Sequence, residues 1–108
     1  MSYSLFIDDE RFPPEGDAAW VIVRSSDEAL AVIKDLGMPC WISFDHDLGG
    51  DDTSMVFLHA LSDHALDTDA RFDFGYYVHS QNPIGAANIV GFIESFRKVF
   101  LEIEPERY

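Results

Sequence analysis

Short apolar runs alternate along the chain with longer segments whose apolar residues recur at helical spacing. Four runs are brief and rich in β-branched or aromatic residues, which predicts strands over 5–7, 20–23, 41–44 and 73–78. The run over 41–44 ends in a dense group of ionisable residues and then a glycine pair. Such groups at the exit of a buried strand are costly unless they are paired, bound to metal or catalytic, so this junction is the first candidate for chemistry.

Three segments have the signals of helices. The first begins with a capping box, in which Ser25 is followed three residues later by Glu28. The second follows the potential N-caps of 51–53 and is expected to fade into a loose polar connection over 62–73. The third begins with Asn82 as N-cap, and its end is ambiguous because residues 101–103 fit either a helix or a short edge strand.

The order strand, loop, strand, helix, strand, helix, strand, helix is typical of an α/β domain. We therefore expect one domain over 1–108, with right-handed crossovers and helices on both faces of the sheet. The predicted fold is a receiver-like (flavodoxin-like) three-layer sandwich with a mainly parallel sheet of four or five strands. In that strand order the first and third strands lie side by side at the switch point.

Charge narrows the range of partners. The 108 residues include 20 acidic and 7 basic ones, and the net charge is −13. This charge opposes broad nucleic-acid binding and anionic membranes, whereas a small phosphorylated ligand or an RNA end could be held by local arginines. A protein partner with a basic surface also fits. With a single cysteine and no apolar span or targeting segment, a cytoplasmic protein is expected.

Carboxylates follow two of the predicted strands. Asp8 and Asp9 follow the first, and Asp45 and Asp47 follow the third. Because such acids repel one another, a hard divalent cation is expected among them, magnesium or alternatively manganese. On an extended trace Asp45 and Asp47 face one way and His46 the other. The alternative is that one or two of these acids only cap turns or helices.

Two histidines lie at predicted strand ends, His46 after the third strand and His79 after the fourth. An imidazole that titrates near neutrality suits general acid or base catalysis, and it can also ligate a metal. A structural hydrogen-bonding role is the alternative for both.

Four further residues are candidates for contacts with phosphate. Arg11 and Arg24 follow the first and second strands, and their guanidinium groups could bind phosphate oxygens or pair with an aspartate. Ser80 and Asn82, with the N–H groups of the last helix's first turn, would complete an anion cradle.

Three ordered motifs, LFIDDER at 5–11, SFDHDLG at 43–49 and VHSQNPIGA at 78–86, resemble the cyclic-phosphate processing receiver domain family. The similarity covers nearly the whole chain. It implies a receiver-like fold and a site directed at phosphate. That family is a distant relative of the response-regulator receiver domain.

Comparison with an ordinary receiver implies further roles. Asp8 and Asp9 look like the acidic pair that holds magnesium, Asp45 looks like the phosphoacceptor, and Ser80 is similar to the hydroxyl residue that ends the fourth strand. The receiver lysine at the end of a fifth strand is missing, since both lysines of this chain lie on predicted helices. The resemblance therefore favours hydrolysis over a phospho-relay switch.

These observations together predict a metal-assisted phosphoesterase-like domain that acts on or binds a cyclic phosphate, for example a nucleoside or RNA-end 2',3'-cyclic phosphate. Asp45, His46 and His79 are the predicted catalytic residues, and the two histidines would act as base and acid. Two alternatives stay open. One is a non-catalytic receiver-like module that binds metal or a phosphorylated ligand, and the other is an acidic interaction protein.

Overall fold

The computed structural model describes residues 3–13, 20–68 and 74–103, and side chains as far as residue 98. The elements in chain order are β1 (Ser4–Ile7), β2 (Trp20–Val23), α1 (Ser26–Leu36), β3 (Trp41–Phe44), α2 (Ser54–Thr68), β4 (Gly75–Val78) and α3 (Pro83–Ile103). Every strand and helix expected from the sequence is therefore present.

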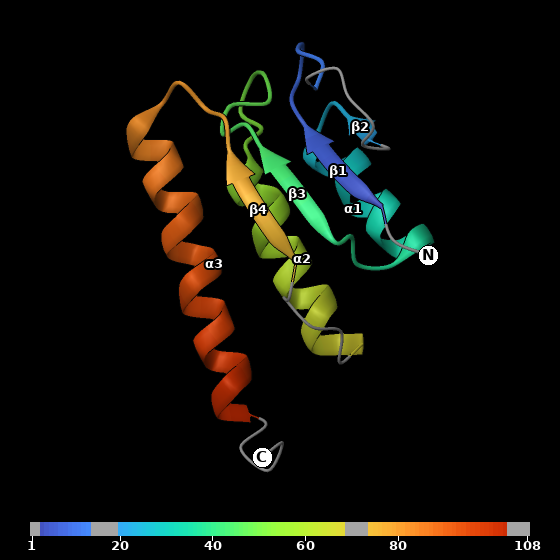
Figure 1. The fold of residues 1–108 in the computed structure, drawn as a ribbon, viewed down its shortest axis with the longest axis vertical. Coiled ribbons are helices and arrows are strands. Elements are labelled where there is room, and N and C mark those ends of the chain that lie inside the picture. The colour runs from blue at the N-terminus through green and yellow to red at the C-terminus, as the bar shows by residue number, and fades with distance from the viewer. Residues whose placement is uncertain (1–2, 14–19, 69–73, 104–108) are drawn as a thin grey trace.

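The four strands form one parallel sheet in the order β2-β1-β3-β4 (Figure 1). The central pair is in register from Ser4 opposite Trp41 to Ile7 opposite Phe44. The receiver-like α/β class and the side-by-side placement of the first and third strands are confirmed. Because all strands run the same way, their carboxyl ends lie along one edge of the sheet.

The three helices form a single layer on one face of the sheet, with α2 packed between α1 and α3 (Figure 1). Alternate strand residues point into this layer, and Leu5, Ile7, Ile42 and Phe44 have 0% of their surface exposed. These side chains belong to one continuous apolar core between sheet and helices.

This arrangement differs from the helices on both faces that we expected. The steps from β2 to β3 and from β3 to β4 cross the sheet in one direction, so right-handed crossovers place α1 and α2 on the same face. The step from β1 to β2 runs the other way, and the sequence predicts a loop there. Within the described ranges, the face opposite the helices therefore carries side chains such as Trp41 and Tyr77 and no helix.

The start of α1 is capped from two directions. Ser25 Oγ accepts the N–H of Glu28 at 3.1 Å, as the capping box predicts. The Glu28 carboxylate accepts the N–H of Arg24 at 2.7 Å, one residue earlier than the motif requires. Asp52, in the loop before α2, accepts the N–H and the hydroxyl of Ser26 at 2.8 and 2.5 Å. These contacts connect the start of α1 to the loop after β3.

α2 is longer than the sequence suggested. The loose connection expected over 62–73 is wrong in its first part, because the helix continues to Thr68. Ala65 is fully buried, and Ser62 is buried with its hydroxyl donating to the carbonyl of His59 at 2.7 Å. Polar residues on the buried face weaken the apolar periodicity that would have shown the helix. The end of the stretch lies outside the described residues.

α3 begins as predicted, with Asn82 Oδ1 accepting the N–H of Gly85 at 3.0 Å. Ile89 and Ile93 are fully buried on its inner face. The helix runs through 101–103, so these residues are not an edge strand. Its N-terminal end stands at the same edge of the sheet as the carboxyl end of β4 (Figure 1).

Candidate functional site

Asp8 directly follows β1 and is fully buried. Its Oδ1 accepts the N–H groups of Glu10 and Arg11, each at 2.9 Å, and its Oδ2 lies 2.9 Å from His79 Nε2. Burial alone would raise the pKa of this carboxyl, but the two backbone donors and His79 outweigh it and hold the pKa below its usual value. Asp8 is therefore an oriented anion at neutral pH.

His79 follows β4, and both of its ring nitrogens have partners. Nδ1 lies 2.8 Å from Ser43 Oγ, and Nε2 faces Asp8. The ring stacks on Phe6, with 4.7 Å between ring centroids and 4° between planes. Since a carboxylate only accepts, Nε2 carries the proton between His79 and Asp8, and the Ser43 hydroxyl can donate to Nδ1 of the neutral ring. Three neighbours thus fix this imidazole.

Asp45 follows β3, and its carbonyl accepts a hydrogen bond from the Ser54 hydroxyl at the start of α2. Burial raises the pKa of the Asp45 carboxyl, and the negative charge of Asp8 raises it further. The charges of His79 and Arg11 oppose this rise only in part. Two carboxylates are therefore held in a position where they repel each other.

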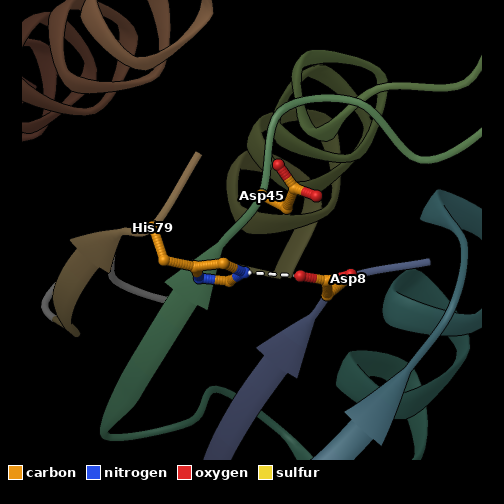
Figure 2. A group of neighbouring side chains, drawn as sticks. All are labelled: Asp8, Asp45 and His79. Carbon is orange, nitrogen blue, oxygen red and sulfur yellow. Dashed lines mark hydrogen bonds and ion pairs between the residues drawn. The ribbon is translucent and has the colours of Figure 1, made fainter. Parts of the chain in front are cut away.

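Asp8, Asp45 and His79 converge at the edge of the sheet, and one ligand atom from each lies within 4.8 Å of the others (Figure 2). The side chains directly follow β1, β3 and β4; the His79 ring and the Asp8 carboxylate face each other, and the Asp45 carboxylate lies above that pair in the view. A divalent cation would relieve the repulsion that raises the pKa of Asp45, so the donor set fits such an ion. The two carboxylates suit magnesium or manganese, and the imidazole adds a preference for a transition metal.

The other two candidate acids lie outside this group. Asp9 is exposed, and Asp47 has 68% of its side chain exposed, with Oδ1 3.0 Å from His46 Nδ1. The His46 ring is 14% exposed and lies against the backbone of Gly85 at the start of α3. His46 and Asp47 therefore form a pair of their own between β3 and α3.

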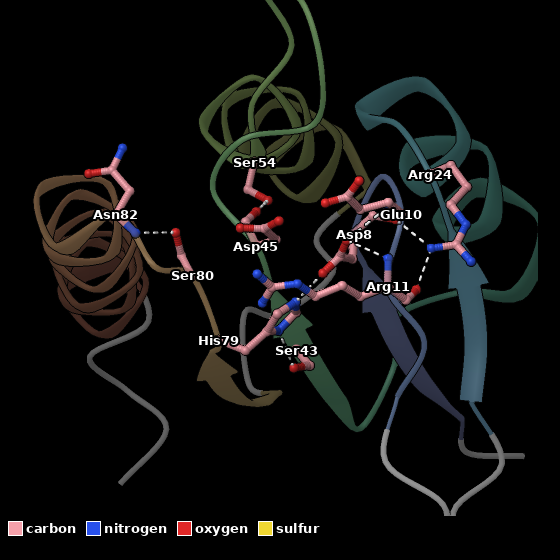
Figure 3. Close-up of polar contacts among 10 residues, drawn as sticks. All are labelled: Asp8, Glu10, Arg11, Arg24, Ser43, Asp45, Ser54, His79, Ser80 and Asn82. Carbon is pink, nitrogen blue, oxygen red and sulfur yellow. Dashed lines mark hydrogen bonds and ion pairs between the residues drawn. The ribbon is translucent and has the colours of Figure 1, made fainter.

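The two candidate arginines differ in whether their guanidinium groups already have hydrogen-bond partners within the described part of the protein. Arg24 Nη1 donates to the carbonyls of Asp8, at 3.0 Å, and Arg11, so this guanidinium holds the loop after β1 (Figure 3). Arg11 is exposed, and its side chain reaches back across the sheet edge toward Asp45 and His79 (Figure 3). Of the two, Arg11 has the guanidinium better placed for an external anion.

Ser80 and Asn82 shape the start of α3. Ser80 Oγ accepts the N–H of Asn82 at 3.0 Å, and Asn82 Oδ1 caps the helix through Gly85 (Figure 3). The Asn82 oxygen is thus engaged, whereas its amide N–H₂ group can still donate to an anion. These two residues stand on the far side of Asp45 from Arg24 (Figure 3).

Sequence reasoning missed the residues that orient the site. Ser43, Ser54 and Phe6 fix His79 or Asp45, as described above. Ser43 could have been noticed as a polar residue inside an apolar strand. The roles of Ser54 and Phe6 had no signal, because a helix-initiating serine and a strand phenylalanine are ordinary.

Comparisons with known proteins identify a family for most of the chain. Neither the comparison with curated proteins nor that with solved structures gives a match. In the part of the chain that the structure describes, none of the helices is long and apolar enough to cross a membrane. A family model matches residues 3–95, which include all the strands and every candidate site residue. The chain belongs to the cyclic-phosphate processing receiver domain family.

Proposed function

We propose that this protein is a metal-assisted phosphoesterase that opens a cyclic phosphate, such as a nucleoside 2',3'-cyclic phosphate. The observation that carries the proposal is the convergence of Asp8, Asp45 and His79 at the sheet edge, in a chain of a cyclic-phosphate processing family. Ring opening adds water across one P–O bond. The water oxygen joins phosphorus, the bond to one ribose oxygen breaks, and one proton is removed and one supplied.

Asp8 and Asp45 would hold the cation, and His79 would join them as a third ligand only by giving up the Nε2 proton that it shares with Asp8. Asp9 and Asp47 would join them only by turning inward, since both are exposed in the structure. When bound, magnesium or manganese would polarise the phosphoryl group and lower the pKa of a bound water. The cation would also offset part of the net charge of −13, which otherwise repels a phosphate.

Arg11 is the residue best placed to bind the phosphate, because its guanidinium is exposed and lies beside His79 and Asp45. Ser80 and the amide group of Asn82 would bind the oxygens nearest α3. Arg24 would act on the phosphate through Arg11, because it already holds the Arg11 carbonyl.

His46 and His79 would share the transfer of protons. Each imidazole is hydrogen-bonded to a carboxylate, His79 to Asp8 at 2.9 Å and His46 to Asp47 at 3.0 Å. Such pairing orients the ring. The two rings are about equally covered, since 15% of His79 and 14% of His46 is exposed, but their carboxylate partners differ. Asp8 is fully buried, whereas Asp47 is 68% exposed, so the pair of His46 and Asp47 is the one open to solvent.

Hydrolysis of 2',3'-cyclic nucleotides by His46→Ala and His79→Ala tests the proposal, with His64→Ala on α2 as the matched control. We expect each of the first two variants to lose about 10²- to 10⁴-fold in turnover, as the removal of a general acid or base does. His64→Ala should retain wild-type turnover. Unchanged hydrolysis in both site variants would remove the acid and base assignment.

Thermal melting with magnesium, manganese and calcium separates binding from catalysis. If His79 ligates the cation, His79→Ala loses the rise in Tm that the wild type shows on adding the metal. If His79 transfers a proton, the variant keeps that rise and loses turnover only. A wild-type Tm that ignores all three cations contradicts the metal site. A cation response without turnover on any cyclic phosphate indicates the non-catalytic module.

A further inference from the structure

The sheet face opposite the helices contains a pocket of about 500 Å³. Phe6, Phe12, Trp41 and Tyr77 line it, together with polar residues at one end. Three of these rings are open to solvent: Phe12 is 73% exposed, Tyr77 61% and Trp41 40%. Aromatic surface gathered in this way marks a binding site more often than a single exposed ring does.

The pocket continues into the candidate active site. His79 and Arg11 line its polar end, and both belong to the site at the sheet edge. Phe6 connects the two regions, because its ring lies parallel to that of His79 at 4.7 Å. A ligand with a phosphate at the edge could therefore extend over the aromatic face.

The walls of the pocket are held in place. The Arg24 guanidinium lies 4.7 Å from the centre of the Phe12 ring while it also bonds the loop carbonyls. Trp41 lies across the neighbouring strand at Gly75, where an added Cβ would come within 2.5 Å of the indole Cζ3. The absence of a side chain at Gly75 thus gives the indole its position. These contacts pre-form the pocket before any ligand arrives.

We propose that this pocket binds the planar base of a mononucleotide whose cyclic phosphate lies at Asp8, Asp45 and His79. This inference rests on the proposed function and adds the part of the substrate that the enzyme would recognise. A base has two apolar faces that stack on aromatic rings, and the volume suits a small ligand. The net charge of −13 favours a mononucleotide over an RNA chain, whose added phosphates would be repelled.

Equilibrium binding with uncleavable probes tests the inference separately from turnover. Adenosine 3'-monophosphate and methyl β-ribofuranoside 3-phosphate, in which a methoxy group replaces the base, are titrated by calorimetry in magnesium. We expect the nucleotide to bind at least tenfold more tightly than the sugar phosphate. Trp41→Ala and Tyr77→Ala should each bring the affinities of the two probes close together, and Trp41→Phe should keep most of the difference between them. Leu66→Ala, an exposed apolar residue on α2, is the control that should change nothing.

Circular dichroism establishes that each variant is folded before its affinity is read. Equal wild-type affinity for the two probes would overturn the inference, and so would an unchanged ratio in the folded Trp41→Ala and Tyr77→Ala variants. Analytical ultracentrifugation tests whether a second copy of the chain, rather than a base, covers this aromatic face. If Trp41→Ala splits a dimer and leaves the ratio intact, the face joins two copies of the chain.

A short RNA ending in the same nucleotide should bind no more tightly than the mononucleotide, and binding tenfold tighter would overturn the choice of a mononucleotide.

These results do not depend on cleavage. A base preference without turnover supports the pocket and contradicts the phosphoesterase. Turnover that is equal for the cyclic phosphates of ribose and adenosine supports the enzyme and contradicts the pocket.

Discussion

Replacement of Gly85 by alanine should destabilise the protein even though alanine is the better helix former. Gly85 is buried in the first turn of α3, where the His46 ring lies against its backbone. An added Cβ would lie 2.7 Å from His46 Cδ2 and 2.8 Å from Nδ1, and closer still to Cγ. Real Cβ atoms do not approach so near, so the ring or the helix start must shift. A shift of the ring would also disturb its hydrogen bond to Asp47.

The magnitude follows from two opposing contributions. Inserting a methyl group into a packed site costs roughly 1–3 kcal/mol. Glycine to alanine in a helix gains at most about 1 kcal/mol, and less in the first turn. The free energy of unfolding of Gly85→Ala should therefore fall by roughly 1–2 kcal/mol. Gly91→Ala is the matched control on the same helix, because nothing lies within 4 Å of its added Cβ. It should gain about 0.5–1 kcal/mol.

Urea denaturation at neutral pH with a chelator gives the free energies of unfolding of both variants. His46→Ala provides the second half of the test, because it removes the ring that the new methyl group would meet. In that background Gly85→Ala should be neutral or stabilising, which corresponds to a coupling energy of roughly 1–3 kcal/mol. Gly85→Ala that is as stable as the wild type would refute the reasoning. A loss that persists without the His46 ring would place the clash elsewhere.

Three further predictions concern stability. Asp45→Asn should raise the Tm in chelator at neutral pH, because the raised native pKa of Asp45 means that its ionisation destabilises the fold. The same variant should lose the stabilisation that magnesium gives the wild type. A Tm in chelator below that of the wild type would contradict the first expectation. Burial raises the pKa of Tyr3 from 10.0 to about 12, so the unfolded chain loses this proton first and stability should fall between these pH values. Tyr3→Phe also lacks the hydrogen bond to Gly37. Urea titrations at alkaline pH should show that its free energy of unfolding falls less with rising pH than that of the wild type. If both proteins lose stability equally over this pH range, Tyr3 is excluded as the cause. Phe57→Ala should lower the free energy of unfolding by about 3–5 kcal/mol, because this side chain is fully buried; a loss below about 1 kcal/mol would contradict its place in the core.

The elements could be predicted because they depend on local patterns. The capping box at Ser25 and the N-cap at Asn82 gave the helix starts, and short β-branched runs gave the strands. The order of strands was expected from the receiver-like (flavodoxin-like) fold class. The single helical layer was not predicted; it is explained by right-handed crossovers together with the loop that the sequence predicts between β1 and β2. The length of α2 was hidden by buried Ser62.

The candidate site was predictable as a set of strand ends but not in its detail. Neighbouring acids such as Asp8 and Asp9 look alike in sequence, yet one is fully buried and the other exposed. That choice depends on which carboxylate meets the N–H groups of Glu10 and Arg11 in the turn. Backbone partners of this kind carry no residue signature. The same holds for the Arg24 contacts, which go to carbonyl groups.

Asp8 serves two purposes with its two oxygens. Oδ1 ties down the turn that follows β1, and Oδ2 faces His79. Removing this side chain would release the turn and free the imidazole together, so an inactive Asp8→Ala protein would say little about which loss matters. The Asp45 carboxylate accepts the backbone N–H of its neighbour His46, whereas Asp8 Oδ1 holds the N–H groups of Glu10 and Arg11. Replacement of Asp45 therefore separates architecture from chemistry more cleanly. Inactivation studies of this domain should therefore begin at β3 and leave β1 intact.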